Sequence, residues 1–273
     1  EPFVAVPAMA EAARRAGAHI MTGCAVRSVE TAAGRISGGV TERGSIACSS
    51  VVLAGGVWSR LFAGNSGIDF PQLKVIGTVA QVSGIKGVSD MPVGAGNFAY
   101  RKRLDGDYII ALRNANIVPI MPDHFRLMFE YLPSFFATWR ELKLRVGPSF
   151  FSELGLRRHW GPHERTIFEE VRTLDPEPSQ RFTRRALENL SHAYPAFAKA
   201  VVRQQWAGVI DVTPDAVPVI SEVAALPGFH IASGFSVHGF GVGPGAGQLM
   251  ADIVMGTPPL VDPAPFHIRR LRP

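Results

Sequence analysis

The sequence predicts an α/β (α+β) protein of two domains, and three observations support this. Val51-Val52-Leu53-Ala54 is a continuous apolar run that ends at Gly55-Gly56, which is typical of a strand buried on both faces of a parallel sheet. Residues 229–256 have the pattern of a strand, a glycine-dense loop and a helix closed by a glycine. Between these ends the pattern changes to longer strands and helical spacing. We therefore expect one domain from residues 1–75 and 205–273, with residues 76–204 inserted as a mixed-sheet domain.

The amino-terminal part predicts a helix that is followed by short strands. Small apolar side chains between Ala8 and Ala16 form one face of the helix, and Gly17 is suited to its C-terminal cap. Hairpin turns are expected at Gly34-Arg35 and Arg43-Gly44. The expected strands cover residues 19–22, 25–31, 36–41 and 45–48.

The middle of the chain predicts a hairpin and two helical regions. Residues 97–103 and 108–113 read as strands around the turn Leu104-Asp105-Gly106-Asp107. Residues 178–199 read as a helix, and residues 124–154 have helical spacing with an apolar stripe. We expect this stripe to pack on the core, with a partner-binding or membrane-surface helix as the alternative. Its members are Phe125, Met128, Phe129, Leu132, Phe135, Phe136 and Trp139.

Composition limits the class of protein. The chain of 273 residues is 47% hydrophobic and 19% charged, which is typical of soluble globular proteins, and no apolar stretch is long enough to span a bilayer. We expect a cytoplasmic location. The net charge of +5 comes from scattered residues, which disfavours nucleic-acid binding and suits anionic substrates. Cys24 and Cys48 form no metal-binding pattern, and a disulfide between them stays open.

The most informative segment runs from Gly234 to Gly247, between a strand and a helix. A helix start offers unpaired backbone N–H groups and the positive end of the helix dipole, while glycines let a flat ligand approach the main chain. This segment is therefore suited to bind negative charge. Taken alone, the segment is better explained as a tight turn between a strand and a helix.

Neighbouring segments decide between these interpretations. Trp206–Ile220 (WAGVIDVTPDAVPVI), Leu226–Phe229 and the glycine segment together resemble the C-terminal signature of the D-amino-acid oxidase superfamily of FAD enzymes, which includes glycine oxidase and the sarcosine oxidases. Glu1-Pro2 with its helix and VVLAGGVWS at 51–59 resemble the mid-chain unit of that family. The resemblance covers nearly the whole chain. It implies a glutathione-reductase-like FAD domain with an inserted substrate domain.

The resemblance also implies which residues contact the cofactor. The adenosine diphosphate half of FAD would lie near Val26, Ala54, Gly55 and Trp58. The resemblance assigns His238 a catalytic role in stabilising negative charge, with a structural histidine as the alternative. No cysteine near Gly208 matches the covalent flavin attachment of monomeric sarcosine oxidase, so we expect noncovalent FAD. The expected flavin contacts are Gly208, Phe235, Ser236, Val237, His238, Gly239, Phe240 and Gly241.

The sequence departs from the family in two ways. No GxGxxG fingerprint for the pyrophosphate occurs, so we expect either a fragment that lacks its N-terminal βαβ unit or a second chain that supplies it. Ile210 stands where related oxidases carry a carboxylate-binding arginine. Arg101 and Arg113 are substitute candidates for binding the substrate, with exposed strand charges as the alternative.

The resemblance implies oxidation of a small amine or amino acid by hydride transfer to the flavin, which gives an imine. This chemistry needs orientation and charge stabilisation more than a strong base. A partner-dependent, noncatalytic subunit and an inert fragment are the alternatives.

Overall fold

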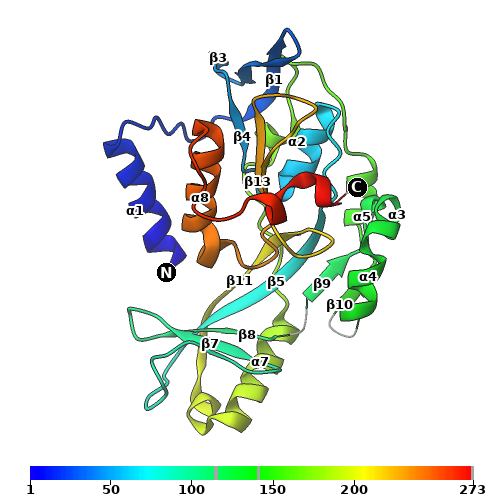
Figure 1. The fold of residues 1–273 in the computed structure, drawn as a ribbon. Coiled ribbons are helices and arrows are strands. Elements are labelled where there is room, and N and C mark those ends of the chain that lie inside the picture. The colour runs from blue at the N-terminus through cyan, green and yellow to red at the C-terminus, as the bar shows by residue number, and fades with distance from the viewer. Residues whose placement is uncertain (114–115, 140–141, 272–273) are drawn as a thin grey trace. The chain divides into compact units, whose positions relative to one another are not determined.

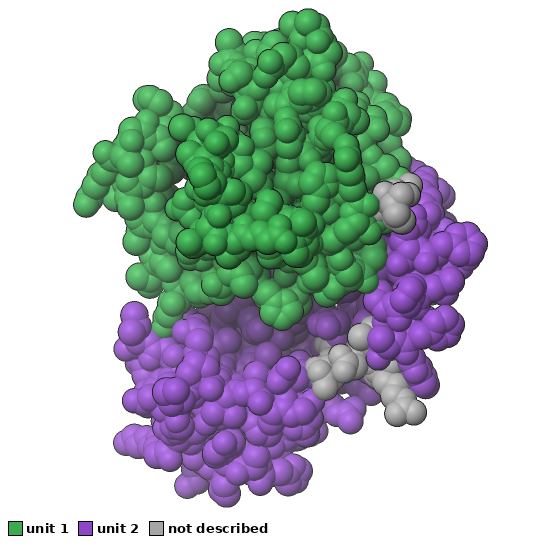
Figure 2. All heavy atoms as spheres, viewed as in Figure 1, with its two compact units in different colours: residues 1–73, 155–173, 211–273 green, residues 74–154, 174–210 purple. Residues whose placement is uncertain are grey.

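The computed structural model describes residues 1–113, 116–139 and 142–271 (Figure 1). The chain divides into two compact units, coloured in Figure 2. Unit 1 comprises Glu1–Leu73, Gly155–Thr173 and Asp211–Pro273, and unit 2 comprises Lys74–Leu154 and Leu174–Ile210.

Residues 155–173 belong to unit 1, whereas the sequence analysis assigned them to the inserted domain. Specific contacts explain the difference. Arg27 Nε and Nη2 donate to the two carboxylate oxygens of Glu169, each at 2.9 Å. Trp160 Nε1 donates to the Arg27 carbonyl at 2.7 Å, and the Phe168 ring lies edge-on to Trp58 at 5.5 Å. The role of each unit in binding stays a prediction.

Unit 1 contains two three-stranded sheets with helices around them. The first is antiparallel in the order β1-β2-β3, and the second has the order β12-β13-β4. Cys24 and Cys48 are both free thiols. The elements are α1 (Pro2–Arg15), β1 (Val26–Ala32), β2 (Arg35–Thr41), β3 (Gly44–Ala47), β4 (Val51–Leu53), η1 (Gly56–Trp58), α2 (Ser59–Asn65), α6 (Ile167–Glu170), β12 (Val219–Glu222), β13 (Phe229–Ser233), α8 (Gly239–Met255), η3 (Ala264–Phe266) and η4 (Ile268–Leu271).

Two sequence-based expectations for unit 1 are wrong. Residues 19–22 form no strand. The strand at Val51 is buried on one face only: Leu53 is buried, whereas Val52 on the opposite face is 41% exposed. β4 lies at the end of its sheet, paired in parallel with β13. The apolar pattern indicated a strand but not its position in the sheet.

The core of unit 1 forms between the second sheet and its helices. Phe229 and Ile231 of β13 are fully buried and cluster with Leu53, Phe62 and Phe70. Ala246, Leu249 and Met250 of α8 pack with Ile220 of β12. This packing holds the middle of α8 against β12.

Unit 2 is built on a mixed sheet of seven strands. Six of them lie in the order β10-β9-β5-β8-β7-β6, and the seventh, β11, pairs with β5. The expected hairpin is confirmed as β7 and β8, with Tyr100 opposite Ile110. The elements are β5 (Leu73–Ser83), β6 (Val93–Gly94), β7 (Ala99–Lys102), β8 (Tyr108–Ala111), β9 (Asn116–Pro119), α3 (Pro122–Arg126), α4 (Met128–Thr138), β10 (Leu142–Arg145), α5 (Ser149–Leu154), α7 (Gln180–Ala193), η2 (Pro195–Lys199) and β11 (Val201–Val212).

Residues 124–154 differ from the expected core-packed helical region. They form α4, the strand β10 and α5, with α3 beginning just before them. The apolar stripe is largely exposed, with Phe129 at 76% and Phe136 at 70%, while Leu127 between α3 and α4 is buried. Helical spacing predicts that apolar side chains lie on one face of a helix, but it does not predict whether another element covers that face. In the described part of the chain, no helix has both the length and the hydropathy to cross a bilayer.

Candidate functional site

Two glycine turns meet at one edge of the second sheet of unit 1. Because β4 and β13 are parallel, their carboxyl ends lie at the same edge, and open α/β sheets bind ligands there. Gly55 and Gly56 lie just beyond β4, and Gly234 follows β13. Ser233 Oγ lies 3.2 Å from the Gly56 carbonyl oxygen, so the two turns are in direct contact.

A buried polar network fixes both turns. Asp211 Oδ2 accepts the Gly234 N–H at 2.6 Å, the Ser233 hydroxyl at 3.1 Å and the Gln72 amide at 3.1 Å. Gln72 Nε2 also donates to the Gly56 carbonyl at 3.0 Å. Hydrogen bonds to a charged acceptor are stronger than neutral ones, so the carboxylate holds the turns in place before any ligand binds.

The backbone after β13 adopts unusual conformations. Gly234, Ser236 and Val237 have φ values of +82°, +47° and +79°. The first needs a glycine, because a Cβ there would lie 2.4 Å from Thr213 Cγ2. Left-handed backbone at a β-branched residue costs about 1–3 kcal/mol and is concentrated at functional sites. Two hydrogen bonds of Ser236 stabilise this backbone conformation. Its N–H donates to the Asp211 carbonyl at 3.0 Å, and its hydroxyl donates to the Gly234 carbonyl at 3.1 Å.

The helix α8 begins at Gly239, with His238 as its N-cap residue. The glycine pattern predicted a loop as far as Gly247, and the predicted extent of the loop is wrong. Glycine disfavours helix locally, but burial of the α8 core side chains overrides this preference. Beside Gly241, Gly243, Gly245 and Gly247, a Cβ would meet nothing within 4 Å.

These features fit a flat, electron-rich cofactor such as FAD. Space beside the glycines of α8 is open, and the first turn of a helix presents free N–H groups. Gly55 has no room for a side chain larger than hydrogen without displacement, since a Cβ would lie 3.3 Å from Ser59 Oγ. That hydroxyl is buried and has no hydrogen-bond partner among the described residues.

The other residues predicted for the cofactor are distributed over both units. His238 and Val237 are exposed beside Phe235 and the buried Ser236, and Trp58 is half-buried. Val26 begins β1 in the other sheet of unit 1, and Ala54 is exposed just after β4. Gly208 lies on β11 in unit 2.

The residues predicted for the substrate lie in unit 2, and Arg113 lines a cavity of about 1040 Å³ there. Its Nη1 donates to the Ala95 carbonyl at 3.2 Å. Arg101 lies on β7 opposite Ile109. Ile210 packs over the sheet, with its Cδ1 3.1 Å from the place that a Cβ would take at Gly77.

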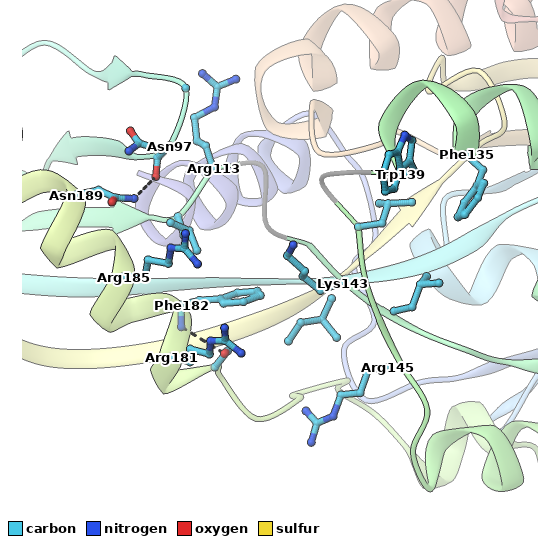
Figure 3. A pocket seen from close by; sticks show the side chains of 16 residues that line it. Asn97, Arg113, Phe135, Trp139, Lys143, Arg145, Arg181, Phe182, Arg185 and Asn189 are labelled. Atoms are coloured by element: carbon cyan, nitrogen blue, oxygen red, sulfur yellow. Dashed lines mark hydrogen bonds between the residues drawn. The ribbon is translucent and has the colours of Figure 1, made fainter.

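Sequence reasoning missed most of the cavity. Figure 3 shows the side chains that line it. Four further cations lie there, together with aromatic and aliphatic side chains. The cations that were missed are Lys143, Arg145, Arg181 and Arg185. The four-residue spacing of the last two within a predicted helix was the available signal.

A family model described as FAD dependent oxidoreductase matches residues 1–253. The chain belongs to this family. Its members use FAD, and the expected resemblance to the D-amino-acid oxidase superfamily is confirmed.

Individual relatives support the FAD dependent oxidoreductase assignment. The L-amino acid deaminase from Proteus vulgaris superposes with a TM-score of 0.93 at 34% identity, over 99% of this chain and 63% of that chain. Glycine oxidase from Pseudomonas aeruginosa is 24% identical over 85% of this chain and 49% of the relative. Sarcosine oxidase subunit beta from Rhodobacter capsulatus is 25% identical over 94% and 49%. The chain thus spans about half the length of these two curated relatives and less than two thirds of the deaminase.

Proposed function

We propose that this protein oxidises the C–N bond of an amine or amino acid, with noncovalent FAD as the acceptor. The observation that carries the proposal is the Asp211 network, which joins the glycine turns after β4 and β13 at the start of α8. It occurs in a chain that matches the FAD dependent oxidoreductase family over residues 1–253. The names of the relatives describe enzymes that act on amino acids or on an N-methyl amino acid, which supports this substrate class.

The residues of unit 1 would bind FAD by backbone geometry. In this proposal Phe235–Gly241 contact the flavin ring, and Gly55 and Trp58 contact the adenosine diphosphate half, as do Val26 and Ala54. When bound, FAD supplies the hydride acceptor. The exposed His238 at the N-cap of α8 would stabilise negative charge at the helix start, where the dipole also favours it.

We further propose that Arg113 binds the carboxylate of the substrate. Its guanidinium lines the cavity of unit 2, and arginine binds carboxylates with two parallel hydrogen bonds. Arg101 is the second candidate. Ile210 would contribute an apolar contact only.

A partner-dependent form of the same activity is the second candidate. One of the relatives is named as a subunit, sarcosine oxidase subunit beta. A glutathione-reductase-like FAD domain uses a GxGxxG turn for the pyrophosphate, and the printed sequence contains no such turn. In this form, another polypeptide segment supplies that turn.

The test is an absorption spectrum of the purified protein before and after FAD is added, with intact mass and chain composition from the same sample. A flavin spectrum that bleaches with an amine or amino acid supports the proposal. Copurification of a second chain that is needed for the flavin spectrum supports the partner-dependent form. A colourless protein that ignores added FAD in the presence of any copurified chain overturns both.

A further inference from the structure

The cavity of unit 2 is lined by an excess of positive charge. Its cationic side chains come from three places in the fold, namely the end of the β7–β8 hairpin, the strand β10 and the helix α7. Among the described residues that line it, none is a carboxylate. The five cations are Arg113, Lys143, Arg145, Arg181 and Arg185.

Their spacing directs them to common faces. Arg181 and Arg185 are four residues apart on α7 and therefore share one face of the helix. Like charges at this spacing destabilise an isolated helix by about 0.2–0.5 kcal/mol. Lys143 and Arg145 are two residues apart on β10 and share one face of that strand. All four side chains line the cavity, and Figure 3 shows Lys143 and Arg145 extending from β10 to different parts of it.

No ion pair neutralises these five cations within the described part of the chain. Elsewhere cations are matched with carboxylates, as in Arg27 with Glu169 and Arg172 with Glu42. Unit 2 has such pairs as well, for example Lys74 with Glu153 and Arg126 with Asp123. A cavity lined by positive charge attracts anions and concentrates them.

Most of the other side chains that line the cavity are apolar. Phe182 lies between the two arginines in the α7 sequence, and Leu112, Ile117 and Phe135 contribute further apolar surface. Asn189 Nδ2 donates to the Asn97 carbonyl at 3.0 Å, which ties α7 to the β6–β7 turn. A volume of about 1040 Å³ is ample for a small molecule. The lining thus suits a ligand with an apolar spacer and more than one negative group.

We propose that this cavity binds a small dicarboxylate, and that the amine or amino acid oxidised by the protein carries a second carboxylate. The second statement rests on the proposed function, whereas the binding statement does not. One carboxylate is bound by Arg113 and the other by the arginines of α7. Lys143 and Arg145 strengthen the positive potential that both carboxylates meet.

The test is calorimetric titration of the full chain with glutarate, pentanoate and inorganic phosphate. Glutarate and pentanoate have the same number of carbons and differ by one carboxylate. We expect glutarate to bind at least about tenfold more tightly than pentanoate, which corresponds to about 1.4 kcal/mol. Equal binding of glutarate and pentanoate overturns the proposal, and so does phosphate binding that matches or exceeds that of glutarate.

Substitutions test whether the preference for glutarate depends on the arginines of α7. The double substitution Arg181→Gln with Arg185→Gln should reduce glutarate binding to the level of pentanoate. The matched control is the double substitution Arg35→Gln with Arg184→Gln, which removes the same charge from two residues outside the cavity lining. This control should keep the tenfold preference for glutarate. Circular dichroism confirms that each variant folds. Loss of the preference in the control pair overturns the site, because net charge alone would then explain it.

The outcomes are distinguishable from those of the proposed function. Glutarate is not an amine, so its binding requires neither FAD nor turnover. Glutarate selectivity in a protein that ignores FAD supports the site while the redox proposal fails. A protein that bleaches flavin with an amine but shows no glutarate preference supports the redox proposal and overturns the site.

Discussion

At the scale of single residues, the geometry of the candidate flavin loop depends most on Asp211. One carboxylate oxygen accepts three donors, of which the Gly234 N–H is at 2.6 Å. We expect Asp211→Ala to lower the free energy of unfolding by about 3 kcal/mol, since it removes charge-assisted hydrogen bonds and leaves the Gly234 N–H without its acceptor. It should also weaken FAD binding. Urea denaturation and flavin titration measure the two effects.

The control for this prediction is Asp262→Ala. Asp262 accepts a single exposed hydrogen bond from Ala264 N–H, so its loss should change stability by less than about 0.5 kcal/mol. Equal urea midpoints for the wild type and Asp211→Ala would contradict the prediction.

A second residue-scale prediction concerns acid stability. Arg172 donates to both carboxylate oxygens of Glu42 at 2.6 and 2.7 Å, and this pairing, together with the hydrogen bond from the Ala25 N–H, lowers the pKa of Glu42 from 4.5 to about 2. A lowered pKa in the folded state means that the ion pair stabilises the protein above about pH 4.5 and that this contribution is lost as the pH falls toward 2. Glu42→Gln should therefore lower the urea midpoint at pH 7 and make its decline between pH 5 and 3 shallower.

The matched control is Glu188→Gln on the exposed side of α7, which should keep the wild-type pH dependence. Urea midpoints at pH 7, 5, 4 and 3 for all three proteins provide the comparison. A pH dependence in Glu42→Gln as steep as that of the wild type would assign the acid sensitivity to other carboxylates.

At the scale of elements, glycines serve two different purposes in α8. Some leave space beside the helix, and one allows the backbone conformation that ends it. A Cβ at Gly243 or Gly247 meets nothing within 4 Å, whereas Gly256 ends the helix with φ of +67°. Without flavin, Gly243→Ala should stabilise the protein by about 0.5–1 kcal/mol, because alanine favours helix. Gly256→Ala should destabilise it by a similar amount.

Thermal unfolding of the flavin-free protein tests the two signs. The same glycine-to-alanine change is made twice in one helix, so each variant controls for the other. With FAD added, Gly241→Ala at the start of α8 should bind flavin more weakly than Gly247→Ala. Equal flavin affinity in these two variants would argue against close approach of the cofactor at the helix start.

The elements also show how far sequence reasoning reaches. The β7–β8 hairpin was predicted because its Asp-Gly turn and its strand pattern are local signals. The exposure of Val52 and the early start of α8 were missed, because they depend on sheet position and tertiary packing. Likewise, the glycine turns of the site were found, but Gln72 and Asp211, which are 139 residues apart, form a contact that no spacing rule reveals.

At the scale of the whole molecule, the chain forms two units with separate cores. Phe70, Phe229 and Ile231 are buried in the core of unit 1, and Tyr108, Leu190 and Phe197 in that of unit 2. The proposed cofactor contacts that follow β4 and β13 belong to unit 1, and the cationic cavity belongs to unit 2. A ligand that binds only the folded form stabilises the part that it contacts.

Hydrogen exchange with each ligand therefore tests the assignment of the two sites. FAD should slow amide exchange in residues 234–247 and 55–65, and glutarate should slow it in residues 142–145 and 180–193. The glutarate effect should vanish in the Arg181→Gln and Arg185→Gln double variant, while the FAD effect persists there. Protection by glutarate that is confined to unit 1 would contradict the cavity assignment, and FAD protection without any change near Gly234 would contradict the flavin site.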